Sequence, residues 1–210
     1  MVTEGRPPSG RPFDPLEIRL DQDDDLYRVH SGRFQAVEFN PGRGARSRFA
    51  FFEVDGGTVP VLYAASTPEA AVCETILHDL PPEEAKLYPS AFNGRVLSRL
   101  HPARGLRLAS LTSEGLRRLR TRASDVTNTS PREYGATVKW AEAAFLAGYD
   151  GLAWVSDKHN ESYAYVFFGR PGQGAAFIQD PGFARAFGVN PADDDWLVGY
   201  CEKLGISVIG

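Results

Sequence analysis

Five polar side chains occur within or at the ends of segments that are otherwise apolar, and their types could do chemistry together. They are Arg28, Arg48, Tyr63, Glu74 and Ser156. A guanidinium group matches the oxygens of phosphates and stays charged. A carboxylate that is partly shielded from water can stabilise positive charge in a transition state. The set could therefore bind an anionic substrate and act on it.

Each of these residues also has a structural explanation. Arg28 and Glu74 could form an ion pair between a strand and a helix. Tyr63 could be a core aromatic residue whose hydroxyl has a hydrogen-bond partner. Ser156 could cap a turn. The residues alone leave the structural and the functional interpretation open.

Three of the five residues lie in predicted strands. The segment VPVLYAA is β-branched and aromatic, which is typical of a strand. A Gly- and Arg-rich loop over residues 39–48 precedes it. The predicted strands cover residues 26–30, 48–52 and 59–65, and they contain Arg28, Arg48 and Tyr63 in that order.

A helix is predicted over residues 66–80, where two prolines end it. It has two possible N-caps: Ser66, spaced from Glu69 as in a capping box, or Thr67, which a proline follows. Glu74 would lie inside this helix, at the margin of its apolar stripe. An apolar margin would partly exclude water from the carboxylate.

The rest of the chain alternates irregularly between strands and helices. Strands are predicted over residues 95–100, 106–111, 151–155 and 163–168, and helices over 113–119, 134–147 and 194–204. Ser156 begins the polar loop 156–162 between the last two strands. This irregular order predicts the α+β class, with a compact mixed sheet and flanking helices.

Composition excludes several classes of function. The 23 Lys and Arg against 27 Asp and Glu give a net charge of −4, so direct binding to nucleic acid is not expected. Two cysteines and four scattered histidines predict no metal site. No P-loop, G-x-G-x-x-G or G-x-S-x-G pattern is present. Without a long apolar stretch or a secretory signal, we expect a cytoplasmic protein with no membrane contact.

The order and spacing of the five residues resemble the RES domain family, the toxins of many bacterial RES–Xre toxin–antitoxin pairs. The matching segments are YRVHSGRF (27–34), RSRFAFF (46–52), VLYAASTPEAAVCETILHDL (61–80), EYGATVKWAEAAFLAGYDGLAWVS (133–156) and YAYVFFG (163–169). The resemblance implies a RES domain over residues 23–172. A flexible tail over 1–22 would precede it, and an extension over 173–210 would pack on the same domain.

The resemblance also implies a fold similar to ADP-ribosyltransferases and an enzyme that acts on NAD as substrate, with no further cofactor. Arg28, Glu74 and Ser156 would be catalytic, and Arg28, Arg48, Tyr63 and Ser156 would bind NAD. The arginines suit the pyrophosphate, Tyr63 could stack on nicotinamide, and Ser156 could bond to a ribose hydroxyl or to the nicotinamide amide. One departure concerns the loop DKHNES after Ser156, where many relatives carry glycines.

Three functions follow as hypotheses. The enzyme could cleave NAD with water or phosphate as acceptor, as a glycohydrolase or phosphorylase. It could instead be a mono-ADP-ribosyltransferase that modifies a host protein. A third possibility is a RES-like binding module without catalysis. The expected partners are NAD, an Xre-type antitoxin protein and, for a phosphorylase, phosphate.

Overall fold

The computed structural model describes residues 6–7, 10–81, 83 and 85–209. Its main feature is an eight-stranded sheet in which all neighbouring strands are antiparallel except the parallel pair β8 and β9. In spatial order the strands are β1 (Glu17–Leu20), β8 (Leu106–Ser110), β9 (Gly151–Val155), β10 (Tyr163–Phe168), β5 (Val61–Ala65), β2 (Leu26–Ser31), β7 (Arg95–Pro102) and β11 (Phe177–Ala186).

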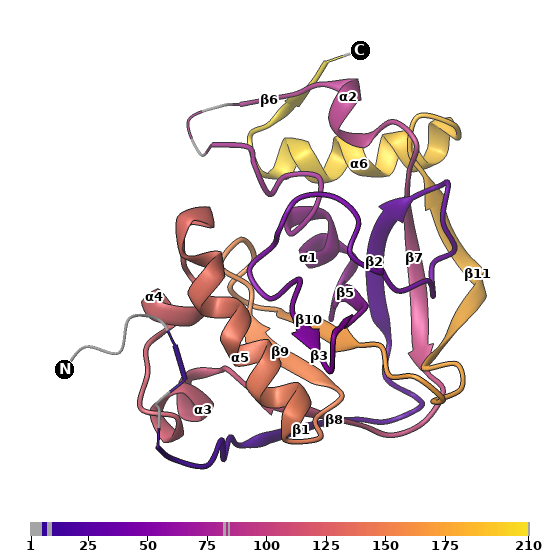
Figure 1. Cartoon of the computed structure of the whole chain (residues 1–210). Coiled ribbons are helices and arrows are strands. Elements are labelled where there is room, and N and C mark those ends of the chain that lie inside the picture. Colours follow the sequence, from indigo (N-terminus) through magenta and orange to yellow (C-terminus); the bar gives the residue numbers. More distant parts are fainter. Residues whose placement is uncertain (1–5, 8–9, 82, 84, 210) are drawn as a thin grey trace.

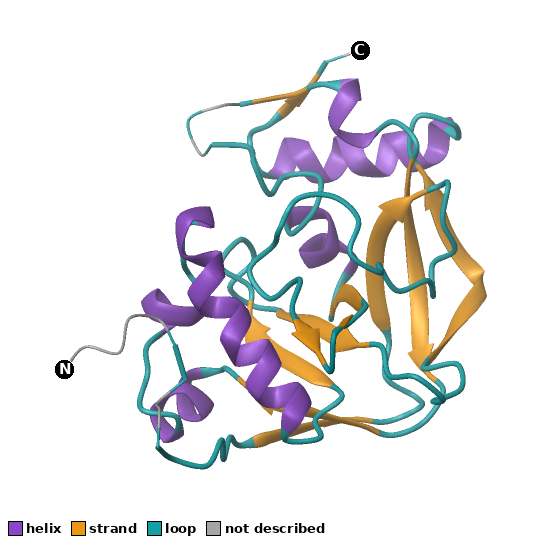
Figure 2. Cartoon of the chain, in the orientation of Figure 1, coloured by secondary structure: helices purple, strands orange, loops and turns teal. Residues whose placement is uncertain are grey.

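Helices cover the two halves of this curled sheet. The helices are α1 (Pro68–Cys73), α2 (Pro89–Phe92), α3 (Ser113–Arg118), α4 (Ala123–Val126), the 3-10 turn η1 (Pro131–Glu133), α5 (Tyr134–Leu146) and α6 (Pro191–Lys203). Figure 1 shows α3, α4 and α5 near β8 and β9, and α2 and α6 near β7 and β11. The mixed sheet with its flanking helices (Figure 2) confirms the predicted α+β class.

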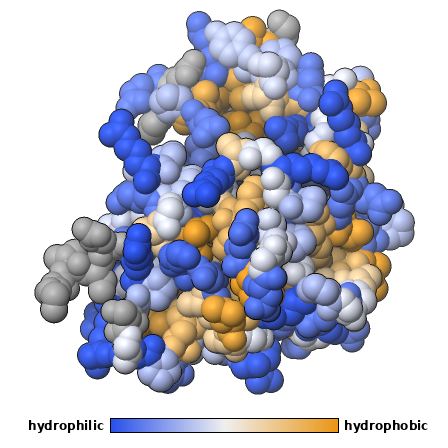
Figure 3. All heavy atoms as spheres, viewed as in Figure 1, coloured by the Kyte–Doolittle hydropathy of each residue, from blue (hydrophilic) through white to orange (hydrophobic). Residues whose placement is uncertain are grey.

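Two short ribbons complete the fold. Their strands are β3 (Glu53–Val54) with β4 (Gly57–Thr58), and β6 (Lys86–Leu87) with β12 (Ser207–Val208). No helix in the described part of the chain is long and apolar enough to cross a bilayer. Hydrophilic residues cover much of the face seen in Figure 3, and apolar residues show between them.

Three apolar clusters form the core, and they pack each half of the sheet and join the two halves. One cluster packs α5 against β9 and β10 and includes Trp140 and Trp154, which are 1% and 2% exposed. A second cluster joins α1 and α6 to β2 and β7, and it includes Phe187 and Leu97. A third cluster spans the two halves and packs Leu26 of β2 and Leu100 of β7 with Leu62 of β5. Apolar packing therefore joins the halves where the backbone pairing between β2 and β5 stops.

The sheet opens between β2 and β5. These neighbours pair only at Tyr27 and Ala65, after which β2 continues along β7 and β5 along β10. The loop that follows β2 crosses to the start of β5. There Asn40 and Val61 exchange two backbone hydrogen bonds of 2.7 and 3.0 Å. The two strands therefore diverge after one residue pair, and the loop between them bridges back to the start of β5.

Two predicted elements differ from the structure. Residues 48–52 form no strand, because the chain turns back there and Ser47 and Ala50 exchange backbone hydrogen bonds of 2.9 and 3.2 Å. The helix predicted over residues 66–80 ends at Cys73. Beyond it, the N–H groups of Ile76 and Leu77 both donate to the carbonyl of Val72, so these apolar residues are buried in turns.

The N-cap of α1 is Thr67. Its hydroxyl accepts a hydrogen bond from the N–H of Ala70 (3.1 Å), and a proline occupies the first helical position. The alternative cap, Ser66, has a different role: its hydroxyl accepts from the N–H of Tyr163 (3.0 Å) in β10. The sequence was compatible with either residue as the N-cap, and in the structure the N-cap is Thr67.

Two edge strands were not predicted. β1 lies inside the segment expected to be an N-terminal tail, and its four residues pair with β8. β11 lies in the extension after Gly172 and pairs with β7, although the register shifts between Gln179 and Ala184 around Pro181. Pro and Gly make this segment resemble a loop in sequence, yet an edge strand with a bulge tolerates both.

Gly151 in β9 lies too close to β10 for any side chain. A Cβ added there would be 2.2 Å from the carbonyl oxygen of Val166. We expect Gly151→Ala to destabilise the fold by about 3 kcal/mol or more, measured by chemical denaturation. As a control, Gly199→Ala in α6 meets open space and should stabilise by about 1 kcal/mol. Equal stabilities of the two variants would contradict this packing.

Candidate active site

A pocket of about 750 Å³ occupies the space between β2 and β5. Residues 27–31 of β2 line one side, and Tyr63 of β5 lines another. Four of the five predicted site residues line this pocket. They are Arg28, Arg48, Tyr63 and Glu74, which come from four different segments of the chain.

The pocket is basic although the chain is acidic overall. Its lining includes five arginines against three carboxylates. The arginines are Arg28, Arg43, Arg46, Arg48 and Arg95, and the carboxylates are Glu38, Glu74 and Asp79. Such a local excess of positive charge favours an anionic ligand. Among the described residues no group of three His, Cys, Asp or Glu side chains could hold a metal ion.

Glu74 is the C-cap residue of α1 and is partly buried. Burial raises its pKa above the ordinary value of 4.5. A hydrogen bond from Ser156 lowers the pKa, the negative charge of Asp157 raises it, and the positive charges of Arg48 and His78 lower it. Burial prevails, so this carboxylate is a stronger base than an exposed glutamate.

Ser156 lies behind Glu74 and is fully buried. Its hydroxyl donates to Oε1 of Glu74 at 2.6 Å, and it accepts from the N–H groups of Lys158 and His159 at 3.2 and 3.0 Å. The turn-capping role is therefore confirmed, and the same hydroxyl also orients the carboxylate. Ser156 does not line the pocket, so its geometry fits a positioning residue and not one that touches a ligand.

Arg48 is a buried cation whose side chain is only 9% exposed. Its nearest partner is Asp157, at 4.0 Å between Nη1 and Oδ1, which is a long ion pair. Nε of Arg48 is buried without a hydrogen-bond partner, and so is Oδ1 of Asp157. A guanidinium with spare donors beside a pocket is suited to bind an anion.

Tyr63 fixes the segment that carries Arg48. Its hydroxyl makes a 2.9 Å hydrogen bond with Ser47 Oγ and accepts from the N–H of Phe49 at 3.3 Å. Burial raises the pKa of Tyr63 to about 12, so the phenol stays protonated at neutral pH. The interpretation of a core aromatic with a satisfied hydroxyl is confirmed. In addition, the residue lines the pocket.

Arg28 does not form the ion pair with Glu74 that was one structural interpretation. Instead, its Nη1 donates to the carbonyls of Ala36 and Glu38, at 2.6 and 2.8 Å. Burial lowers the pKa of Arg28 to about 10, which leaves it charged at neutral pH. One half of its guanidinium therefore holds the loop after β2. No other hydrogen bond of its side chain is found within the described residues.

Asp157 is one residue near the site that the sequence did not predict. It neighbours Arg48 and also acts on the charge of Glu74. A search for polar residues inside apolar elements could not find it, because it lies in the polar loop 156–162. Its position directly after Ser156 was the available signal. The loop that departs from the family pattern thus contributes a charge to the site.

Comparisons with known proteins identify a family and a similar fold. The profile of a family described as the RES domain matches residues 25–187. The fold is similar to a chain in a crystal structure of the M. tuberculosis MbcT–MbcA toxin–antitoxin complex. That likeness has a TM-score of 0.54 and 13% identity, over 79% of this chain and 85% of the other. The comparison with curated proteins finds no match.

We predict that Glu74 destabilises the folded protein at neutral pH. Because folding raises its pKa, the ionised form costs stability, and this cost grows as pH rises from about 4.5 through the folded-state pKa. Glu74→Gln removes the charge and keeps an acceptor for Ser156. The variant should have a higher Tm than the native protein at pH 7.5, and the difference should close towards pH 4.

The matched control is Glu142→Gln, on the outer face of α5, where the carboxylate pairs with Lys139. This variant should show no such pH-dependent gain in thermal denaturation. A lower Tm for Glu74→Gln at pH 7.5 would mean that the carboxylate stabilises the fold through its neighbours.

Proposed function

The chain belongs to the RES domain family, and on that premise we propose that it binds NAD in this pocket and releases nicotinamide from it. Water or phosphate would accept the ADP-ribose. One observation carries the proposal: a partly buried carboxylate, Glu74, is oriented by Ser156 and lies near the buried cation Arg48 in an arginine-rich pocket.

The reaction breaks the bond between the ribose C1 carbon and the nicotinamide nitrogen. The bonding electrons move to the pyridinium nitrogen and neutralise it, while positive charge develops on the ribose, as in glycoside cleavage. Glu74 is the group that stabilises this charge, because its carboxylate is already oriented and partly shielded from water. Water then yields ADP-ribose and a proton, whereas phosphate yields ADP-ribose 1-phosphate.

The arginines bind the pyrophosphate of NAD in this proposal. Arg48 has a buried Nε without a partner, so a phosphate oxygen would satisfy a donor that the free protein leaves unpaired. Arg28 contributes only the part of its guanidinium that does not hold the loop carbonyls. Tyr63 offers its ring to nicotinamide, and a volume of about 750 Å³ is in the range of ligand pockets, about 300–1,000 Å³.

We further propose that the protein is the toxin of a type II toxin–antitoxin pair, with an Xre-type antitoxin as its partner. The family and the fold shared with a chain of the MbcT–MbcA toxin–antitoxin complex support this. Expression should arrest growth and lower cellular NAD. Co-expression of the protein encoded by the adjacent gene should restore both. Normal growth on expression of a soluble protein would contradict the toxin role.

Glu74→Gln should abolish turnover. We expect nicotinamide release from NAD by the purified protein to fall by a factor of about 100 or more, because the variant cannot stabilise the ribose cation electrostatically. The assay follows nicotinamide with and without added phosphate. Glu142→Gln, at a residue that does not line the pocket, should retain full activity. Unchanged activity in a folded Glu74→Gln variant would remove the catalytic role of this residue.

A labelling assay separates degradation of NAD from transfer of ADP-ribose to a protein. Labelled NAD added to a cell lysate should give soluble ADP-ribose or its phosphate. A discrete labelled protein band would instead identify a mono-ADP-ribosyltransferase. Absence of NAD binding by calorimetry would leave the RES-like binding module as the function.

Two neighbours of Glu74 should shift the pH dependence of kcat/KM in opposite directions. The hydrogen bond from Ser156 lowers the pKa of Glu74, so Ser156→Ala should move the acid limb to higher pH. The charge of Asp157 raises that pKa, so Asp157→Asn should move the limb to lower pH. Shifts in the same direction would contradict carboxylate catalysis by Glu74. Ser110→Ala, a buried serine in β8, is the structural control.

A further inference from the structure

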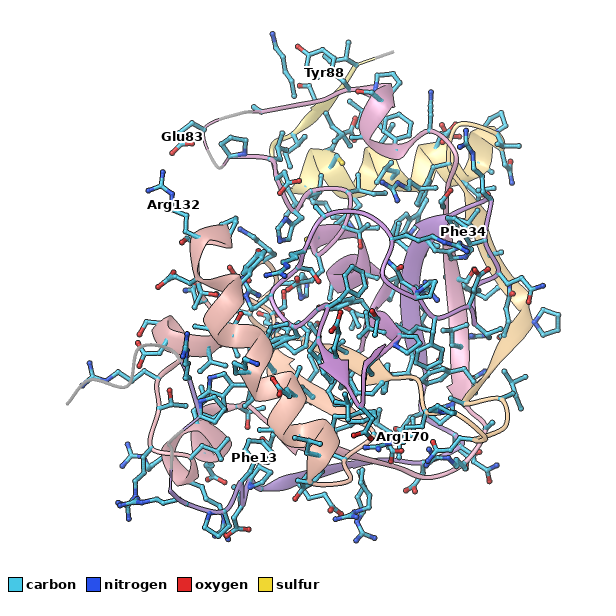
Figure 4. All side chains as sticks on the ribbon, viewed as in Figure 1. Phe13, Phe34, Glu83, Tyr88, Arg132 and Arg170 are labelled. Atoms are coloured by element: carbon cyan, nitrogen blue, oxygen red, sulfur yellow. The ribbon has the colours of Figure 1, made fainter. Side chains whose placement is uncertain are left out.

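Phe34 is exposed, whereas the other aromatic residues that line the pocket are buried or half-buried. Its side chain is 42% exposed, whereas Phe49 and Phe52 nearby in sequence are almost fully buried. It follows the turn that ends β2, where its N–H donates to the carbonyl of Ser31 (3.1 Å). Figure 4 shows it beside that end of the strand. A large apolar surface left open in a binding pocket is suited to a flat apolar ligand group.

The structure also fixes a cation above this ring. Cζ of Arg43 lies 5.3 Å from the centroid of Phe34, which is within cation–π range. Arg43 pairs with Glu38 at 3.6 Å, and its N–H donates to Asn40 Oδ1 at 2.7 Å. Because Arg28 holds the carbonyl of Glu38, the segment carrying Phe34 is fixed before any ligand binds. The aromatic ring and the guanidinium are thus preorganised together.

The position of this pair along the pocket decides which part of a dinucleotide it meets. Arg48 is associated with Glu74 and Asp157, at the reacting end. Arg28 is bonded to the loop that carries Phe34. The charges that act on Glu74 are those of Asp157, Arg48 and His78, and the charge that acts on Arg28 is that of Glu38. The loop that carries Phe34 and Arg43 therefore meets a part of the pocket away from the Glu74 carboxylate.

We infer that Phe34 and Arg43 form the subsite for the adenine base of the substrate. This inference rests on the proposed function, because a nicotinamide riboside bound at Glu74, with its pyrophosphate on the arginines, leaves the adenosine at the Phe34 end. A purine presents a π face that stacks on an aromatic ring, and a guanidinium adds a cation–π contribution. Base stacking of this kind changes affinity by about five- to a hundredfold.

Binding measurements test the subsite without any reaction. Calorimetric titration compares adenosine monophosphate, which carries the adenine half of NAD, with nicotinamide mononucleotide, which carries the other half. Phe34→Ala should weaken adenosine monophosphate binding about tenfold or more and leave nicotinamide mononucleotide binding unchanged. Phe34→Tyr keeps the π face and should restore adenosine monophosphate binding to near the native affinity.

The matched control is Tyr88→Ala, because Tyr88 is a similarly exposed aromatic (49%) that does not line this pocket and lies apart from Phe34 in Figure 4. The Tyr88→Ala variant should bind adenosine monophosphate and nicotinamide mononucleotide with the same affinities as the native protein. Equal binding of adenosine monophosphate by Phe34→Ala and native protein, or no binding by either, overturns the adenine subsite. Nicotinamide release from NAD by the native protein separately tests the proposed reaction, so the two failures are distinguishable.

Discussion

Strands β2 and β5 share one residue pair, Tyr27 with Ala65, and then separate. A sheet that opens in this way loses cross-strand hydrogen bonds, and the protein compensates in two ways. The carbonyls of Ala36 and Glu38 in the crossing loop receive donors from Arg28, and Asn40 pairs with Val61. All of these residues except Ala36 also line the pocket. The stability of the fold and the shape of the pocket therefore depend on the same few contacts.

Electrostatics within the opened sheet follow from burial. Glu74 and Arg48 are removed from much of the solvent, yet neither has an ideal partner: the carboxylate has a neutral serine, and the guanidinium has an aspartate at 4.0 Å. Leaving charged groups incompletely paired costs folding free energy. A bound ligand that carries the complementary charges would offset this loss of folding free energy.

The sequence could predict the elements that follow periodic patterns. The strands at 151–155 and 163–168 were predicted with their true bounds. The end of α1 could not be predicted from periodicity, because Ile76 and Leu77 are buried just as well in the turns after Cys73. Four pocket residues were predicted because they are polar in apolar surroundings. Asp157 and Phe34 lie in loops, where neither periodicity nor a polar residue in an apolar segment marks them. Only the folded chain brings them to the site.

The bulge in β11 also limits how far this edge strand can pair with a strand of another chain. Both edge strands of the eight-stranded sheet are poorly suited to pair with a strand of another chain. β1 has only four residues, and β11 is interrupted around Pro181, which has no N–H to donate. A neighbouring chain could form only a few consecutive backbone hydrogen bonds with either edge. The opened sheet is thereby protected from growing into fibrous aggregates through its rims.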